Sequence, residues 1–185
     1  GMKDVVYPEE AQSDKTKIIT EFVQFISDRM ASKQVFFSTD VFGTIIGSYV
    51  DSMSVGQDYS LMAGCVDYMC PMIYPSHYGN GNFGIEYPDT EPYKTIEGAL
   101  RASKKDLSLE MRDGEYQAVV RPWLQGFTAS YLQHYISYGK EQIRAQIQAV
   151  YDSGYDEWLI WNAANNYDFS AFLTKEEAER IETQR

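Results

Sequence analysis

The chain has 185 residues, the length of a single domain, and 44% of them are hydrophobic, as in a globular protein with a real core. Its formal net charge is −11, and a surface of this sign repels nucleic-acid phosphates and anionic membrane surfaces. Aromatic residues make up 15% of the chain, and their rings stack on sugars as well as on bases. With this charge, we expect residues 2–185 to form one domain whose partner is carbohydrate, with no nucleic acid bound.

The sequence contains no hydrophobic stretch near the roughly 20 residues that a membrane-spanning helix needs, so no membrane insertion is expected. No signal peptide opens it, and Gly1 before Met2 is typical of a remnant of tag removal, which leaves the cell compartment unassigned. Two cysteines, Cys65 and Cys70, flank or lie in a predicted core strand. This position favours buried thiols over a disulfide or a metal pair.

The first half of the chain alternates between helix and strand patterns. In chain order it predicts a short strand at residues 2–8, a helix at 13–32 and a core strand at 35–42. A loop with a helical turn follows at 44–64, then the next core strand at 66–74 and a long loop at 75–92. The long loop is rich in Gly, Asn, Pro and Tyr, and ordered loops of this length are usually functional. Apolar residues at helical spacing predict one buried stripe on the first helix, formed by Ile18, Phe22, Phe25, Ile26 and Met30.

The second half continues the alternation with a helix from about Tyr93 and a third core strand at residues 116–125. A helix at 140–153, a fourth core strand at 157–162 and a last helix from near Thr174 follow. Such alternation predicts parallel strands joined by right-handed crossovers. The strands are almost continuously apolar, which predicts a sheet covered on both faces. The inward positions of the two long helices are predicted to be Ile96, Ala99, Leu100, Leu107, Ile143, Ile147, Val150 and Tyr151.

In residues 66–78 an apolar strand changes abruptly into aromatic and polar residues, and this is the pattern on which the functional prediction depends. The other three main strands end in the same way. Parallel strands point in one direction, so their polar ends are expected to meet on one rim, where the loops of α/β barrels bind ligands. This rim is predicted to carry Asp40, Tyr74, Ser76, His77, Tyr78, Arg121, Trp123, Gln125, Trp161, Asn162 and Asn165.

The rim combines residue types that suit a carbohydrate site, since rings stack on sugars, amides and Arg bind hydroxyls, and carboxylates act as acids, bases or nucleophiles. Asp40 is the candidate catalytic residue, and its alternative is a structural carboxylate paired with Arg121. Trp123 and Trp161 fit core packing as well as sugar platforms. His77 fits a ligand contact as well as a bond that stabilises the loop. The predicted substrate-binding residues are Tyr74, His77, Tyr78, Arg121, Trp123, Gln125, Trp161 and Asn162.

The sequence carries no signature of a cofactor or a metal site. It has two histidines, of which His134 is interpreted as structural, and no clustered His and Cys spacing of the kind that binds zinc. A Gly-rich phosphate loop, a G-x-S-x-G nucleophile elbow and a dinucleotide fingerprint are also missing from it. No cofactor and no metal are therefore expected.

Four stretches resemble a bacterial family of glycoside hydrolase-like TIM barrels that is recorded as a domain of unknown function. They are Ser38-Thr39-Asp40-Val41-Phe42-Gly43, residues 66–78 with the string P-M-x-Y-P-S-H-Y, residues 121–128, and Trp158-Leu159-Ile160-Trp161-Asn162; residues 56–58 and 143–151 also match. The resemblance implies a (β/α)8 barrel that acts on a polysaccharide. It covers only the C-terminal half of the family's domain, whose upstream strands include one that ends in an acidic segment.

The sequence therefore predicts an α/β fold of TIM-barrel-like (β/α) repeats, an incomplete half-barrel of four to five parallel strands. A complete barrel needs eight strands and typically ~250 residues. We expect the open edges to be covered by a second copy in a homo-oligomer or by a missing N-terminal half. A glycosidase needs two carboxylates, and Asp40 is one. Two functions stay open: a hydrolase whose second carboxylate comes from elsewhere, and a non-catalytic module that binds carbohydrate or another protein.

Overall fold

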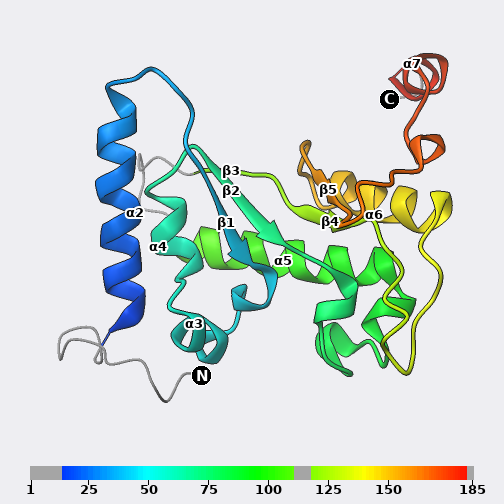
Figure 1. The fold of residues 1–185 in the computed structure, drawn as a ribbon, viewed down its shortest axis with the longest axis horizontal. Helices are drawn as coiled ribbons and strands as arrows, with labels where there is room; N and C mark the ends of the chain where they lie inside the picture. Colours follow the sequence, from blue (N-terminus) through cyan, green and yellow to red (C-terminus); the bar gives the residue numbers. More distant parts are fainter. Residues whose placement is uncertain (1–13, 111–117, 183–185) are drawn as a thin grey trace. The chain divides into compact units, whose positions relative to one another are not determined.

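A computed structural model (Figure 1) describes residues 14–110 and 118–182 of the chain. The strand predicted at residues 2–8 and the first two residues of the strand predicted at 116–125 lie outside the described part. Helices and strands alternate along the described residues, and the strands pair in parallel within each compact unit. The predicted α/β class with parallel strands is confirmed.

The chain groups into two compact units, and each of them is discontinuous in sequence. Among the described residues, the first unit comprises 14–73, 99–110 and 118–122, and the second comprises 74–98 and 123–182. Helix α5 (Pro92–Glu110) begins in the second unit and ends in the first. Residues that are distant in the sequence therefore meet inside each unit.

The first unit contains three parallel strands, β1 (Ser38–Phe42), β2 (Tyr68–Met72) and β3 (Val119–Val120). Strand β2 lies between the other two, because both β1 and β3 pair with it. Val41 of β1 and Met69 of β2 have no exposed surface. These apolar side chains anchor the strands in the core of the unit, since burying each one contributes roughly 1.5–3 kcal/mol.

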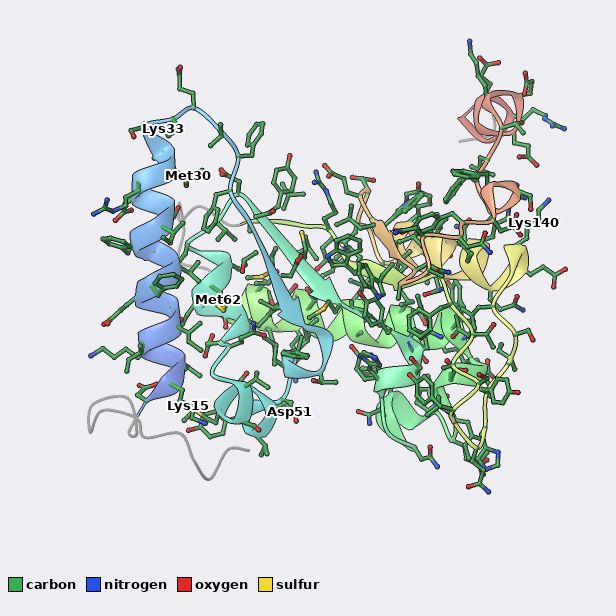
Figure 2. The ribbon with its side chains drawn as sticks, in the orientation of Figure 1. Lys15, Met30, Lys33, Asp51, Met62 and Lys140 are labelled. Carbon is green, nitrogen blue, oxygen red and sulfur yellow. The ribbon has the colours of Figure 1, made fainter. Side chains whose placement is uncertain are left out.

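Three helices of the first unit are α2 (Lys15–Ala31), α3 (Tyr49–Val55) and α4 (Tyr59–Ala63), and the short turn η2 (Gly43–Ile45) follows β1. Each helix begins after a side chain that accepts a hydrogen bond from a backbone N–H of the first turn, which satisfies one of the unpaired donors there. These capping side chains belong to Asp14, Ser48 and Asp58. Met62 of α4 is 1% exposed and lies in the core of the unit (Figure 2).

The stripe predicted to be buried on α2 is exposed over three of its residues. Ile18, Phe22 and Phe25 are 37%, 62% and 48% exposed, so the prediction is wrong for them. Helix α2 packs against α3 and α4 of its unit. The residues that it buries are Thr16 and Val23, which are seven positions apart and therefore lie on one face two turns apart. Ile18 and Phe25 each lie two positions, or about 200°, from a residue of this face, so they are on the opposite side of the helix.

The second unit contains two parallel strands, β4 (Trp123–Gln125) and β5 (Leu159–Trp161), and the helices α6 (Lys140–Asp152) and α7 (Lys175–Glu182). The predicted long loop at residues 75–92 is ordered by three short 3-10 turns. These turns, with a fourth that precedes α7, are η3 (Pro75–His77), η4 (Asn82–Gly84), η5 (Pro88–Thr90) and η6 (Phe169–Ala171).

The inward positions predicted for the two long helices are confirmed for seven of eight residues. The buried ones are Ile96, Ala99, Leu100, Leu107, Ile143, Ile147 and Val150, while Tyr151 is half-buried. Cys65 and Cys70 are buried and no disulfide joins them, as predicted, and burial raises the pKa of the Cys65 thiol above its usual value.

Two predicted elements differ from the structure for identifiable reasons. The third strand, predicted at residues 116–125, consists of the separate strands β3 and β4. Pro122 lies between them, and proline has no N–H to donate to a strand ladder. The loop predicted at residues 44–64 contains helix α3 in addition to the expected turn. This helix has only seven residues, and its Tyr49 and Val50 are each 77% exposed, so it shows no buried apolar stripe; Ser48 caps its start.

Candidate functional site

In the first unit, Asp40 lies within β1, two residues before the strand ends. Asp40 is exposed and Val41 is completely buried, so the two side chains point to opposite faces. Asp40 is opposite Cys70 in the parallel register, and on the other side of β2 the N–H of Arg121 donates to the carbonyl of Met69 at 2.9 Å. The backbone therefore places Asp40, Cys70 and Arg121 in one row, with the outer two roughly 10 Å apart by two strand spacings.

The side chain of Arg121 packs on an aromatic ring. Its guanidinium carbon lies 3.9 Å from the ring centroid of Tyr68, and the edge of Phe36 approaches the same ring at 5.8 Å between centroids. Tyr68 is the first residue of β2, so the guanidinium leans toward the N-terminal end of that strand. Ligand sites of α/β barrels lie at the opposite, C-terminal end. This geometry gives Arg121 a packing role, while its predicted contact with substrate stays a prediction.

In the second unit, Tyr74 and His77 lie together around η3. The ring of Tyr74, 5% exposed, contacts the edge of His77 at 5.0 Å and that of Phe127 at 5.9 Å between centroids. The imidazole of His77 stays partly exposed, and its partial burial lowers the pKa below the usual value of 6.5. The imidazole is therefore mainly neutral at pH 7, with one nitrogen that donates and one that accepts.

The two predicted tryptophan platforms meet on one face of the β4–β5 pair. In the register, Trp123 is opposite Leu159 and Gln125 is opposite Trp161, so these four side chains share a face. The rings of Trp123 and Trp161 meet edge to face, with centroids 6.1 Å apart. Trp161 is 44% exposed, and Trp123 is half-buried. The pair thus presents aromatic surface to solvent instead of filling the core.

Gln125 is completely buried and connects three chain segments of the second unit. Its Nε2 donates to Oδ1 of Asp89 at 2.9 Å and to the carbonyl of Phe127 at 3.1 Å, and its Oε1 accepts from the N–H of Ser76 at 3.0 Å. The side-chain amide of Gln146 pairs with both backbone groups of Gln125, at 2.9 Å each. Gln125 therefore positions the loops around the strand end.

Asn162 and Tyr78 also support the loops. The Nδ2 of Asn162 donates to the carbonyl of Gly126, and its Oδ1 accepts from the N–H of Ala164 at 2.9 Å. Tyr78 is 8% exposed, and its hydroxyl has no partner within the described part of the chain. Burial raises the pKa of Tyr78 well above its ordinary value, so the phenol stays protonated. The predicted contacts of Asn162 and Tyr78 with substrate stay predictions.

Asp89 is a residue that the sequence analysis missed. It lies in η5 and is 3% exposed. Its Oδ1 accepts from Gln125 and its Oδ2 accepts weakly from the N–H of Ile136 at 3.4 Å, while its backbone carbonyl accepts from the hydroxyl of Tyr138 at 3.0 Å. Burial raises the pKa of the Asp89 carboxyl, and the bond from Gln125 opposes this effect. An aspartate in a Pro-rich loop is usually exposed, so nothing in the sequence indicated its burial.

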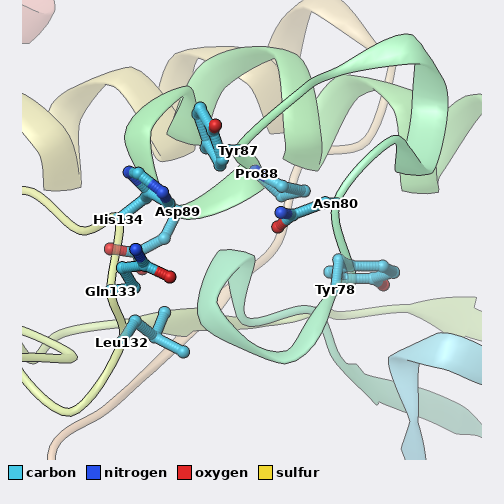
Figure 3. A pocket seen from close by; sticks show the side chains of 8 residues that line it. All are labelled: Tyr78, Asn80, Tyr87, Pro88, Asp89, Leu132, Gln133 and His134. Atoms are coloured by element: carbon cyan, nitrogen blue, oxygen red, sulfur yellow. The ribbon is translucent and has the colours of Figure 1, made fainter.

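Asp89 lines a small pocket in the second unit, with a free volume of about 120 Å³. Figure 3 shows Leu132, Gln133 and His134 on one side of it, and Tyr78 and Asn80 on the other. Tyr87, Pro88 and Asp89 complete the lining. The imidazole of His134 stacks on the ring of Tyr87, with centroids 3.9 Å apart and planes at 28°. His134, interpreted as structural from the sequence, is an exposed part of this wall.

Within residues 14–110 and 118–182, no group of three or more His, Cys, Asp and Glu side chains is arranged to hold a metal ion. The same residues include no helix with the length and hydropathy that crossing a membrane requires.

The parallel strands, the intervening helices and the polar strand ends define a TIM-barrel-like α/β protein. Residues 1–167 match the family described as "Putative glycosyl hydrolase domain", and the chain belongs to this family. A search of the curated proteins finds no significant match. The predicted family is therefore confirmed, and the match covers most of the chain.

Solved structures with a similar fold are carbohydrate-active enzymes. The glycoside hydrolase domain of PgaB (BpsB) from Bordetella bronchiseptica aligns with a TM-score of 0.54 and 11% identity, over 80% of this chain and 37% of that one. The endo-β-1,4-mannanase of Thermotoga petrophila aligns at 0.44 and 16%, over 89% and 36% of the two chains. Bee venom hyaluronidase aligns at 0.39 and 14%, over 67% and 34%. The likeness to the PgaB domain, at 11% identity, establishes similarity of fold alone, and this chain spans 37% of that domain.

The number of strands agrees with the finding that this chain spans only part of the PgaB domain. The described residues contain five strands, and a complete (β/α)8 barrel has eight. The chain is therefore a glycoside hydrolase-like domain with part of a TIM-barrel-like fold, as the sequence predicted.

Proposed function

We propose that this domain binds poly- or oligosaccharide at the C-terminal ends of its strands, and that it contributes Asp40 to glycoside hydrolysis. The observation that carries the binding part is the edge-to-face pair of Trp123 and Trp161, which keeps 44% of Trp161 exposed on the face of β4 and β5. A large aromatic ring left in solvent costs free energy unless a ligand covers it. The apolar face of a sugar ring stacks on such a surface.

The hydrolytic part rests on Asp40. Glycoside hydrolysis uses two carboxylates, one as acid or base and the other as nucleophile or base. On the face formed by β1, β2 and β3, one carboxylate is present among the described residues, that of Asp40. The second carboxylate must then come from other residues. Cleavage of a glycan by the full protein should be abolished by Asp40→Asn, which keeps the shape of the side chain. Full activity in this variant would remove Asp40 from the mechanism.

Binding is tested by titrating the chain with neutral cell-wall and plant oligosaccharides while tryptophan fluorescence is recorded. The chain has three tryptophans, so single variants can assign the signal. Trp161→Phe and Trp123→Phe should reduce both the change in fluorescence and the affinity. Trp158→Phe is the matched control, because Trp158 stacks on Phe172 at 5.7 Å and donates to the hydroxyl of Tyr151. A ligand response that all three variants retain would contradict the proposed platforms.

A non-catalytic binding module is the alternative, and the single carboxylate on the β1–β3 face favours it. Such a module would bind oligosaccharide with the same tryptophan signal and would show no turnover. It would also bind equally well after Asp40→Asn. Reducing-end assays on the same glycans that bind therefore separate the two functions.

We also propose that the open strands are covered by a second copy of the chain. Apolar side chains are exposed before β1 and at its end: Val35 and Phe36, which precede the strand, are 48% and 80% exposed, and Phe42, its last residue, is 47% exposed. A light-scattering mass of two chains or more at micromolar concentration is expected. A mass of one chain would contradict self-association.

A further inference from the structure

The pocket around Asp89 is distinct from the predicted rim, with which it shares only Tyr78. Its free volume is about 120 Å³. Sites that enclose whole small ligands are larger, at about 300–1,000 Å³. The pocket therefore has room for one edge of a ligand whose remaining part stays outside.

The polar lining of the pocket is fixed in place by bonds to the rest of the second unit. The carboxylate of Asp89 is held by Gln125 and by the N–H of Ile136, and Tyr138 holds its backbone carbonyl. A carboxylate has about four lone-pair positions, so Asp89 can accept further hydrogen bonds from a ligand. Its hydrogen-bond donors in the described part of the chain, the Gln125 amide and the Ile136 N–H, are both neutral.

The other walls supply a ring surface and amides. The stacked rings of Tyr87 and His134 form a flat wall, and His134 is exposed at its outer side. The amides of Asn80 and Gln133 are exposed at the rim of the pocket and can both donate and accept. A fixed acceptor, two amides and a flat ring wall match the hydroxyl groups and the apolar face of a sugar.

We propose that this pocket is a second sugar subsite, which takes the hydroxyl-bearing edge of one neutral sugar unit against Asp89, Asn80 and Gln133. The inference rests on the proposed function, because it assigns the substrate a further point of contact. Acidic sugars are excluded, since the lining contains no Lys or Arg and a second carboxylate would be placed next to Asp89. The net charge of −11 acts in the same direction.

The two histidines of the chain make the test possible, because His77 lies at the strand-end loop and His134 lies at the pocket. Their imidazole proton resonances, assigned with His134→Gln, are followed while cellopentaose, mannopentaose or a galacturonic acid pentamer is added. At least one neutral pentamer should shift the His134 resonance, and the acidic pentamer should not.

Variants at exposed positions avoid a loss of folding. Gln133→Ala and Asn80→Ala should each weaken binding of the neutral pentamer by about 2- to 10-fold, the effect of one hydrogen bond. Gln24→Ala, which removes an exposed amide from α2 in the first unit, is the matched control and should leave the affinity unchanged. Asp89→Asn should weaken binding further, and its circular dichroism spectrum establishes that it is folded.

The outcomes separate the subsite from the proposed function. A tryptophan response without a shift of His134, or with unchanged affinity in Gln133→Ala and Asn80→Ala, overturns the subsite and leaves the strand-end site standing. A shift of His134 without a tryptophan response supports the pocket and removes the tryptophan platforms. If the acidic pentamer binds more tightly than the neutral pentamers, the proposal that the subsite takes a neutral sugar is wrong. No response to any pentamer overturns both proposals.

Discussion

Asp40 lies within strand β1 of the first unit and Asp89 lies in the turn η5 of the second, and the surroundings of these two aspartates differ. Asp40 is exposed on a strand in a row with Cys70 and Arg121. Asp89 is 3% exposed on a short turn and is held by Gln125. The first is exposed to solvent, and the second is part of a buried polar network.

This comparison separates two ways in which a domain uses carboxylates. An exposed strand residue can be changed at small cost to stability, because water replaces what it loses. Changing a buried residue of a hydrogen-bond network costs more stability, because each lost hydrogen bond leaves a buried polar partner without water. The predictions below test this difference between the units, from the largest expected effect to the smallest.

The largest effect is expected for Gln125→Ala in the second unit. The substitution leaves Oδ1 of Asp89 and the N–H of Ser76 without their partner in a buried setting. We expect the free energy of unfolding to fall by about 3–5 kcal/mol. Asp40→Asn in the first unit should lower it by less than about 1 kcal/mol, as for an exposed carboxylate. Urea denaturation followed by circular dichroism measures both, and equal losses would contradict the comparison.

A smaller loss of stability is expected for Gly126→Ala, because atoms of Ile160 and Trp161 pack closely against this glycine. A Cβ on Gly126 would lie 2.6 Å from Cγ2 of Ile160 and 2.9 Å from the carbonyl oxygen of Trp161. Gly126→Ala should therefore cost about 1–3 kcal/mol through overpacking. In the first unit, a Cβ on Gly64 would come no closer than 3.5 Å to the carbonyl of Leu61, so Gly64→Ala should be nearly neutral. The shift in urea midpoint distinguishes them.

The two units should also respond to pH with opposite signs. Burial raises the pKa of Asp89 above 3.8, so the folded state holds the proton more tightly than the unfolded state does. The stabilising effect of protonated Asp89 is present below about pH 3.8 and is lost as the pH rises through the raised pKa. Hydrogen bonds from Thr16 and Lys17 lower the pKa of Asp14 in the first unit, so its contribution is present above pH 3.8 and is lost as the pH falls.

These signs are read from the difference in urea midpoint between the parent chain and each variant over pH 3–7. The midpoint of the parent relative to Asp89→Asn should fall with rising pH above about 3.8. Relative to Asp14→Asn, it should rise with pH below that value. The same sign in both series would show that burial does not distinguish the two carboxyls.

The smallest effect concerns His77. Its partial burial lowers the pKa below 6.5, so the unfolded chain binds the proton more tightly. Folding stability from this residue is therefore full above pH 6.5 and decreases as the pH falls through the lowered pKa. A proton NMR titration should give a midpoint for His77 below 6.5 in the folded chain and near 6.5 in urea. Equal midpoints would show that the η3 loop does not desolvate the ring.

Local patterns in the sequence were sufficient for the framework. Apolar spacing located α5 and α6 with their buried faces, and alternation of helix and strand predicted parallel pairing. The motifs around residues 66–78 identified the family. Apolar spacing failed on α2, where Phe22 is 62% exposed and Val23 is buried, because the neighbouring helices α3 and α4 decide which face of α2 is buried. The strand predicted at residues 35–42 is shorter in the structure, because β1 begins at Ser38, and the strand predicted at residues 116–125 is divided at Pro122.

The sequence by itself determined which residue types follow each strand, because that order is local and is written in the chain. The tertiary structure decided which of those side chains are buried and what they contact. The bonds of Gln125 to Asp89 and to Ser76 connect residues that are 36 and 49 positions apart. No local periodicity encodes such a separation, so a buried carboxylate in a Pro-rich loop became visible only when folding removed water from it and supplied its donors.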